Sequence, residues 1–380
     1  MQKVLLQILI SILLCVITAF ALPSNQVSLI DKIYVTPEYR AAVVESSREM
    51  IKINFDLQGV ESSVFSDGNL SYSRFSLPGE GFTFEKNKPL LPAATRVVIV
   101  PPDCGLELSV ATSDPRVINA DIQPAICSGD PSNSESVFST KDIPKLNSTF
   151  PAEIAEMSEP YIVRGVRMVN ITTYPIQYDP IEDVYQQYDN IETTVNFKDA
   201  NAVNPVRNPI RRNRSKEFLK FIRSYAINGD DVGRDDPDAE EIPEYNGHYL
   251  VVMHEECLPH VVPFIEWRRK SGWKVDILCL NADDALNANT IKAGIQQRYD
   301  AYLDDRTDPF DQLLLIGDLV NYANLAFQPG WVLASSGHHY DWFFGLLEGG
   351  DDAADVGISR WCAGSPDQLE LFLMRTMRYE

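Results

Sequence analysis

The sequence predicts two folded domains of different class, a sandwich-like all-β domain followed by an α/β domain with a mostly parallel sheet. Residues 22–197 alternate short strand-like runs with turn residues, whereas later residues alternate apolar strand-like runs with helical patterns. Between them, residues 228–247 are rich in Asp and Glu and cannot bury enough apolar surface to fold. We therefore expect a β-rich domain at 22–227, an acidic linker at 228–247 and an α/β domain at 248–380.

The strand-like runs of the first domain are short, and Pro, Gly, Asn and Asp residues separate them. Short strands with frequent turn signals favour a sandwich of two packed sheets. The clearest predicted strands are 95–100, 106–111, 161–169 and 191–197.

The α/β domain begins with a nearly continuous apolar run at 248–253, which is typical of a parallel strand buried on both faces. A helix is expected at 259–271, because Pro259 stands at its start and Gly272 follows its end. The next predicted elements are a strand at 273–280, a helix at 290–302 capped by Asn289, and a strand at 313–316. This order implies right-handed crossovers and helices on both faces of the sheet.

The last part of the chain is expected to form two strands, at 341–347 and 356–359, joined by an acidic turn. Ser365 and Pro366 then begin a helix as its cap and first residue. The apolar face of that helix consists of Leu369, Phe372, Leu373, Thr376 and Met377.

The net charge and the first residues of the chain indicate which partners and which cellular compartment to expect. The formal net charge is -21, which opposes nucleic-acid binding because phosphate backbones reward Lys and Arg clusters. Lys3, an apolar run at 4–17 and the small-residue pattern ending at Ala21 predict a signal peptide cleaved after Ala21. That run is too short to cross a bilayer with ease, so we expect a secreted protein with no membrane span.

One basic stretch, at 204–223, interrupts this acidic protein, and it predicts either a solvated face or a contact with the acidic remainder. Arg234, inside the acidic linker, is a candidate processing site because cleavage needs an exposed segment.

The five cysteines after Ala21 form no CxxC or other metal-binding spacing, so zinc is not expected. Cys104 and Cys127 could form a disulfide or stay separate buried thiols. Cys257 is expected on a surface loop, and Cys279 in a buried, inert strand. His338-His339 near Cys362 resemble a dyad, but a reactive thiol needs an accessible, electropositive pocket and not proximity in sequence.

Carboxylates are densest at Glu348, Asp351, Asp352 and Asp355. Calcium takes several oxygen ligands of this kind, so Glu348, Asp351 and Asp355 are candidate ligands for a structural calcium ion. The spacing is not that of an EF-hand loop, and a solvated acidic turn is the competing interpretation.

An ordered set of segments resembles the gingipain-like cysteine peptidases, family C25 of clan CD. In the second half these segments are 249–252, 263–275, 291–295, 313–318, 340–344, 349–360 and 379–380. In the first half the matching segments are Pro89-Leu90-Leu91-Pro92, Val100-Pro101 and 174–180.

The resemblance implies a secreted zymogen with a β-rich inhibitory propeptide and a caspase-like catalytic domain that cleaves protein or peptide substrates. In the family a thiolate attacks the substrate carbonyl and a His moves the proton. The propeptide acts as an intramolecular inhibitor, and no cofactor is required beyond a possible structural calcium.

The family's His-Gly motif and nucleophilic Cys lie after the Tyr-Glu that corresponds to Tyr379-Glu380. We therefore expect an incomplete catalytic domain here, with no catalytic residue in this chain and the dyad beyond Glu380. The alternative is a non-catalytic secreted homologue that inhibits or binds a related peptidase through its propeptide-like domain.

Overall fold

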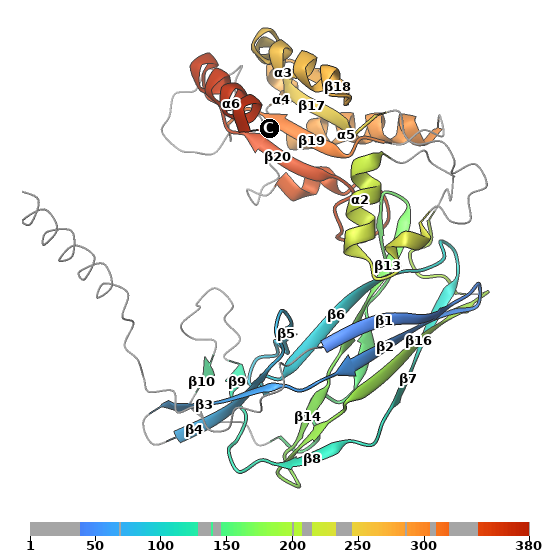
Figure 1. Cartoon of the computed structure of the whole chain (residues 1–380). Helices are drawn as coiled ribbons and strands as arrows, with labels where there is room; N and C mark the ends of the chain where they lie inside the picture. Colours follow the sequence, from blue (N-terminus) through green and yellow to red (C-terminus); the bar gives the residue numbers. More distant parts are fainter. Residues whose placement is uncertain are drawn as a thin grey trace, which may run out of the picture.

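The computed structural model describes two units joined by one helix (Figure 1). The described residues are 39–67, 70–127, 138–139, 146–199, 201–206, 215–232, 245–285, 287–304, 309–318 and 341–379. Residues up to 232 form the β unit and residues from 245 form the α/β unit. The predictions that concern Ala21, Arg234, His338, His339 and Glu380 lie outside these residues.

The first sheet of the β unit has the order β1-β2-β16-β7, and all of its strands are antiparallel. Residues of β2 alternate between half-buried and buried, as a strand with one face on a core does. The strand bounds are β1 Tyr39–Ser46, β2 Met50–Leu57, β16 Asn190–Lys198 and β7 Gly105–Thr112. The predicted strands at 106–111 and 191–197 are therefore confirmed.

A second sheet has the order β11-β13-β6-β5, with β12 paired to β13. Phe55 and Ile191 from the first sheet and Val98 and Ile171 from the second belong to one buried cluster, so the two sheets share a core. The bounds are β11 Ala155–Met157, β12 Tyr161–Val163, β13 Val166–Thr173, β5 Gly81–Phe82 and β6 Pro92–Ile99. Smaller sheets contain β3 Glu61–Asp67, β4 Leu70–Ser76, β8 Arg116–Asn119, β9 Ile126–Cys127, β10 Phe138–Ser139, β14 Ile176–Asp179 and β15 Val184–Gln187.

The expected continuous strand at 161–169 is wrong, because the chain reverses at Arg164-Gly165. These two residues have φ values of 48° and 71°, and Val163 pairs directly with Val166. Two central residues with positive φ form the tight turn that suits the twist of a hairpin. The turn places Arg164 at the tip of the β12–β13 hairpin.

The α/β unit contains a four-stranded parallel sheet with the order β18-β17-β19-β20. Its strands are β17 His248–His254, β18 Lys274–Leu280, β19 Gln312–Ile316 and β20 Gly357–Trp361. Its helices are α3 Leu258–Lys270, α4 Ala282–Ala285, α5 Ala288–Asp304 and α6 Pro366–Tyr379.

Both faces of the parallel sheet are buried. Leu250 and Leu313 pack on one face with Ile295 of α5. Val251 packs on the other face with Phe264 of α3 and Leu369 of α6. This confirms the predicted α/β arrangement, in which continuous apolar strands lie between helices. Within the described part of the chain, no helix has the length and apolar character needed to cross a membrane.

Two local predictions in the α/β unit are corrected. Residues 341–347 do not form a strand, since Asp341–Gly345 is a 3-10 helix, η4, whose Phe344 is fully buried against the sheet core. The cap of α5 is Asn287 and not Asn289, because the Asn287 side chain accepts hydrogen bonds from the backbone N–H groups of Asn289 and Thr290 at 3.0 and 3.2 Å.

The expected acidic linker is narrower than predicted at both ends. The amide side chain of Asn228 pairs with both backbone groups of Ile99 at 2.8 and 3.0 Å, and η1 (Gly229–Asp231) follows. At the other end, the backbone N–H of Asn246 donates to Gly272 at 2.8 Å. Residues 228–232 therefore belong to the β unit, and residues 245–247 to the α/β unit.

Candidate functional site

The carboxyl ends of the four parallel strands meet at one edge of the sheet, the usual place for ligands in an open α/β sheet. His254 ends β17, and its Nδ1 accepts the backbone N–H of Glu256 at 3.1 Å. Arg360 of β20 donates to both carboxylate oxygens of Asp341 at 2.8 and 2.7 Å, and to Gly317 O at 3.1 Å. These contacts fix η4 and the end of β19 to β20.

The described cysteines do not have the environment of a reactive thiol. Cys257 is fully buried in η2 (Glu255–Cys257), and burial raises the pKa of its thiol to about 12. The expectation of a surface loop was therefore wrong. Cys279 is exposed and not buried as predicted, because β18 is an edge strand of the sheet.

Burial also raises the pKa values of the Cys104, Cys279 and Cys362 thiols, opposite to what a nucleophile needs. Cys104 and Cys127 are free thiols in the structure, so the disulfide alternative is not formed. Among the described residues, the geometry assembles no catalytic Cys–His pair.

A densely bonded group of polar side chains lies at the opposite, amino edge of the sheet, where the two units meet. Arg164 of the β unit and Asp311 of the α/β unit form an ion pair whose side chains are 1% and 4% exposed. The other guanidinium nitrogen of Arg164, Nη2, donates to Pro309 O at 2.8 Å. Asp311 also accepts from Ser215 Oγ at 2.5 Å and from the backbone N–H of His248 at 2.7 Å.

The predicted calcium ligands lie beside this ion pair, and two of them, Asp351 and Asp355, accept hydrogen bonds from N–H groups. Asp355 accepts backbone N–H groups from Arg164, Leu347 and Glu348 at 2.9, 2.7 and 2.8 Å. Asp351 accepts from Ile162 N at 2.9 Å and Asn204 Nδ2 at 2.6 Å, both in the β unit.

Glu348, the third predicted ligand, accepts a hydrogen bond from Tyr299 Oη at 3.0 Å. No group of three or more metal-ligating side chains occurs in the described part of the chain. The acidic turn is therefore neither simply solvated nor a three-carboxylate cluster, and calcium binding stays a prediction.

Burial raises the pKa of Asp355 to about 7, although its three backbone donors act in the opposite direction. Nearby, burial lowers the pKa of Lys292 to about 8; its Nζ donates to Leu346 O. Burial therefore shifts the pKa of Asp355 in this turn and that of Lys292 in α5 toward neutral pH.

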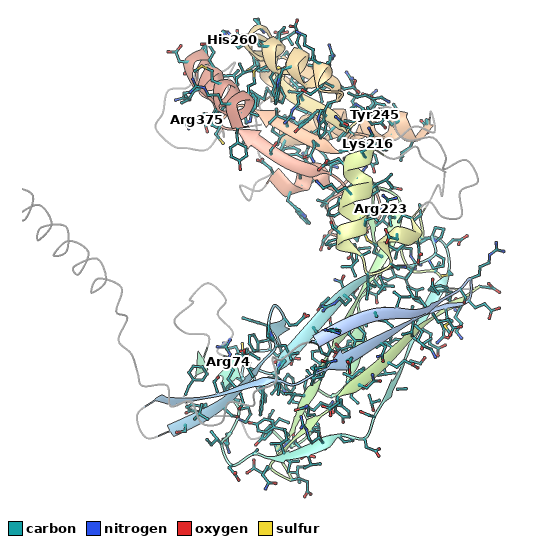
Figure 2. All side chains as sticks on the ribbon, in the orientation of Figure 1. Arg74, Lys216, Arg223, Tyr245, His260 and Arg375 are labelled. Atoms are coloured by element: carbon teal, nitrogen blue, oxygen red, sulfur yellow. The ribbon has the colours of Figure 1, made fainter. Side chains whose placement is uncertain are left out.

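Helix α2 (Lys216–Tyr225) connects the two units. Its cap Ser215 contacts Asp311, and Glu217 N donates to Asn246 O at 3.0 Å, so its first turn lies on the α/β unit. Phe218 and Ile222 pack with Val166 of the β unit. Figure 2 shows Lys216 near Tyr245 at one end of the helix and Arg223 at the end nearer the β unit.

Residues 207–214 of the predicted basic stretch lie outside the described residues. In α2, Lys216, Lys220 and Arg223 are exposed, and Arg223 lies 3.8 Å from Asp230. A cavity of about 340 Å³ separates α2 from the start of β20, and Arg164, Asp311 and Asp355 line it. Sequence reasoning missed Arg164, Asp311 and Ser215; the one available signal was Gly165 inside a strand pattern, which favours a turn.

Comparison with known proteins assigns a family to each unit. Residues 34–227 match the C25 propeptide family, and residues 242–380 match peptidase family C25. The first match alone covers more than half of the chain. The chain belongs to the gingipain-like peptidases of family C25.

Curated relatives come from Porphyromonas gingivalis. Gingipain R2 is 24% identical over 355 residues, which are 90% of this chain and 45% of that protein. Lys-gingipain is 22% identical over 357 residues, 90% of this chain and 20% of that protein. The chain thus spans less than half the length of these relatives.

Two solved structures are also similar. The complex of the RgpB pro- and mature domains from the same organism is 20% identical, with a TM-score of 0.41, and the match covers 50% of this chain and 96% of that one. A structure addressing the zymogenic latency of gingipain K is 22% identical, with a TM-score of 0.37, and the match covers 46% and 100%.

Proposed function

We propose that this chain is the propeptide and first part of the catalytic domain of a secreted, gingipain-type cysteine endopeptidase zymogen. The β unit acts as an intramolecular inhibitor, and the α/β unit is the start of a caspase-like domain. The observation that carries the proposal is the buried contact of Arg164 with Asp311, which joins the part matching a propeptide to the part matching a peptidase. A propeptide must stay bound in a defined position until activation, and a buried, multiply bonded ion pair provides that position.

The chemistry proposed is that of the family. A thiolate attacks the carbonyl of a protein or peptide substrate, a His transfers the proton to the leaving amine, and water hydrolyses the acyl-enzyme. The His and Cys are expected after Glu380, at the sheet edge where His254 and Gly317 lie. The Arg164 contacts of the β unit lie at the opposite, amino edge of the sheet.

The first experiment is intact mass spectrometry of the native secreted protein, with a thiol-dependent peptidase assay before and after maturation. The proposal expects a species longer than this chain, which loses the part before about Gly247 as activity appears. Alkylation of thiols should abolish that activity. A secreted species that ends at Glu380 and inhibits a related peptidase would contradict the proposal and support the non-catalytic alternative.

Calcium is tested separately, by calorimetric titration of the chain. Binding that Asp351→Asn abolishes would support a structural ion at the acidic turn. If the titration shows no heat of binding, calcium is removed from the proposal, and the role of these carboxylates is to accept the N–H groups.

A further inference from the structure

We infer that the α/β unit carries a recognition pocket for one guanidinium group at the amino edge of its sheet, and that Arg164 occupies it. The inference takes from the proposed function only that the β unit is a propeptide. It adds that a guanidinium group is what the α/β unit recognises, and that this contact keeps the two units together after the chain between them is cut.

The acceptors of the pocket come from the α/β unit. Asp311 Oδ1 and Pro309 O accept hydrogen bonds from Nη1 and Nη2 of Arg164, so two acceptors meet the two terminal nitrogens of one planar group. Arginine presents donors in a fixed fork, whereas the ammonium group of lysine is a point charge. The arrangement therefore selects a guanidinium group and not merely a positive charge.

The β unit holds the guanidinium group ready. The Arg164 guanidinium carbon lies 4.4 Å from the ring centroid of Phe218, which belongs to α2. Within the same unit, the tight turn with Gly165 fixes the hairpin tip that carries Arg164. Because these contacts restrict the side chain, little conformational entropy remains to be lost when the pocket binds it.

The buried carboxylate of Asp311 makes the pocket favour a bound cation. Asp311 is 5% exposed, and its carboxylate lies among the amino ends of β17 and β19. A buried carboxylate that loses its partner is much less stable than one that keeps it. Departure of the β unit would remove the donors from both Arg164 and Ser215, so the separated α/β unit would have a vacant anionic pocket.

Another buried arginine shows that burial alone does not define this site. Arg167 is also 1% exposed, but its guanidinium group donates to the backbone carbonyls of Pro101, Cys104, Val203 and Asn204 in its own unit. Arg164 differs because its guanidinium group contacts a carboxylate of the other unit.

The test places a specific protease site between Val232 and Tyr245 in the full chain, cuts it, and measures association of the two parts by analytical ultracentrifugation. The cut wild-type chain should stay associated. Arg164→Ala should weaken association by roughly 30-fold or more, the effect of truncating one partner of a buried charge pair. Arg164→Lys should also weaken it, because the second acceptor stays unfilled.

Chemical rescue supplies the decisive comparison. Millimolar methylguanidinium should restore association of the Arg164→Ala chain, whereas methylammonium should not. The control is Arg96→Ala, which removes an ion pair with Glu80 inside the β unit and should leave association unchanged. The inference would be overturned if the Arg164→Ala chain associated as tightly as the wild type, or if both cations restored association equally.

This outcome is separable from the proposed function. Association of the two parts without inhibition of a mature C25 peptidase would contradict the inhibitory role and leave the pocket in place. Inhibition that survives Arg164→Ala at wild-type affinity would leave the role and remove the pocket.

Discussion

At the scale of single residues, Asp311 and Asp355 show how two carboxylates can be buried side by side. Their exposed fractions are 5% and 2%, yet both oxygens of each one accept hydrogen bonds. An unsatisfied buried carboxylate costs several kcal/mol. The donors therefore decide whether the contact between the two units around Arg164, Asp311 and Asp355, here called the junction, is stable. Both depend on Arg164, one on its side chain and the other on its backbone.

Asp355 gives the first prediction, which concerns pH. Burial raises its pKa from 3.8 to about 7, so the folded state binds a proton more tightly than the unfolded state. The associated stability is fully present below about pH 4 and is lost as pH rises through 7; it amounts to up to about 4 kcal/mol at about 1.4 kcal/mol per pKa unit. Urea unfolding from pH 4 to 8 should show this decline in the wild type but not in Asp355→Asn. Equal pH slopes in both proteins would contradict the assignment.

The thiols give a second prediction at this scale. Cys279 and Cys362 are exposed and Cys257 is fully buried, with raised thiol pKa values for all three. Iodoacetamide at pH 8 should therefore label Cys279 and Cys362 slowly and Cys257 more slowly still, until urea is added. Peptide mass spectrometry of timed samples would measure the order. Rapid labelling of Cys257 in the folded chain would mean that an activated thiol exists there after all.

At the scale of elements, α2 is the piece that belongs to both units. Its cap Ser215 accepts the backbone N–H of Phe218 at 3.1 Å and donates to Asp311, so one hydroxyl closes the helix and contacts the junction. Phe218 and Ile222 lie in the core of the β unit. The helix therefore orients the junction as well as connecting it.

Ser215→Ala is predicted to lower the free energy of unfolding by about 1 to 3 kcal/mol, because it removes a helix cap and a buried hydrogen bond to a carboxylate. Ser224→Ala is the matched control, since this exposed hydroxyl of the same helix bonds only locally, to Phe221 O at 2.8 Å. Its effect should stay within about 0.5 kcal/mol. Equal losses for both variants in urea unfolding would contradict the role of Ser215.

Elements with a strong local signal could be predicted from the sequence. The apolar runs that form β17 and β19 are continuous because the strands are buried on both faces. The predicted cap of α6 is also confirmed, as Ser365 Oγ accepts the backbone N–H of Gln368 at 3.4 Å. Asp341–Gly345 was mistaken for a strand because Phe343 and Phe344 favour strands locally, whereas packing of Phe344 in the sheet core selects a 3-10 turn.

The candidate site could not be predicted in the same way. Arg164 and Asp311 are 147 residues apart, and no sequence motif around either residue indicates that the two form a pair. Arg164 had the local appearance of a polar residue in a strand, and Asp311 that of a loop residue before one. Only tertiary packing brings them together. The acidic turn was noticed, but its spacing alone cannot distinguish metal ligands from acceptors of backbone N–H groups.

At the scale of the whole molecule, the junction should couple the unfolding of the two units. No tryptophan lies in the β unit, and four lie in the described part of the α/β unit, so tryptophan fluorescence follows the α/β unit, while far-ultraviolet circular dichroism reports on both. The two urea midpoints should coincide in the wild type and separate in Arg164→Ala, where the coupling is lost. Separate midpoints already in the wild type would show that the junction couples the units weakly.

The β12–β13 hairpin has a practical consequence. Tyr161 to Met168 is a short antiparallel ladder closed by two residues of positive φ, with its arginine at the tip. A cyclic peptide that reproduces this loop would present the same group in nearly the same orientation without the remaining propeptide, and ring closure would limit the entropy that it loses on binding. The chain thus contains the template for a small synthetic ligand of its own α/β unit.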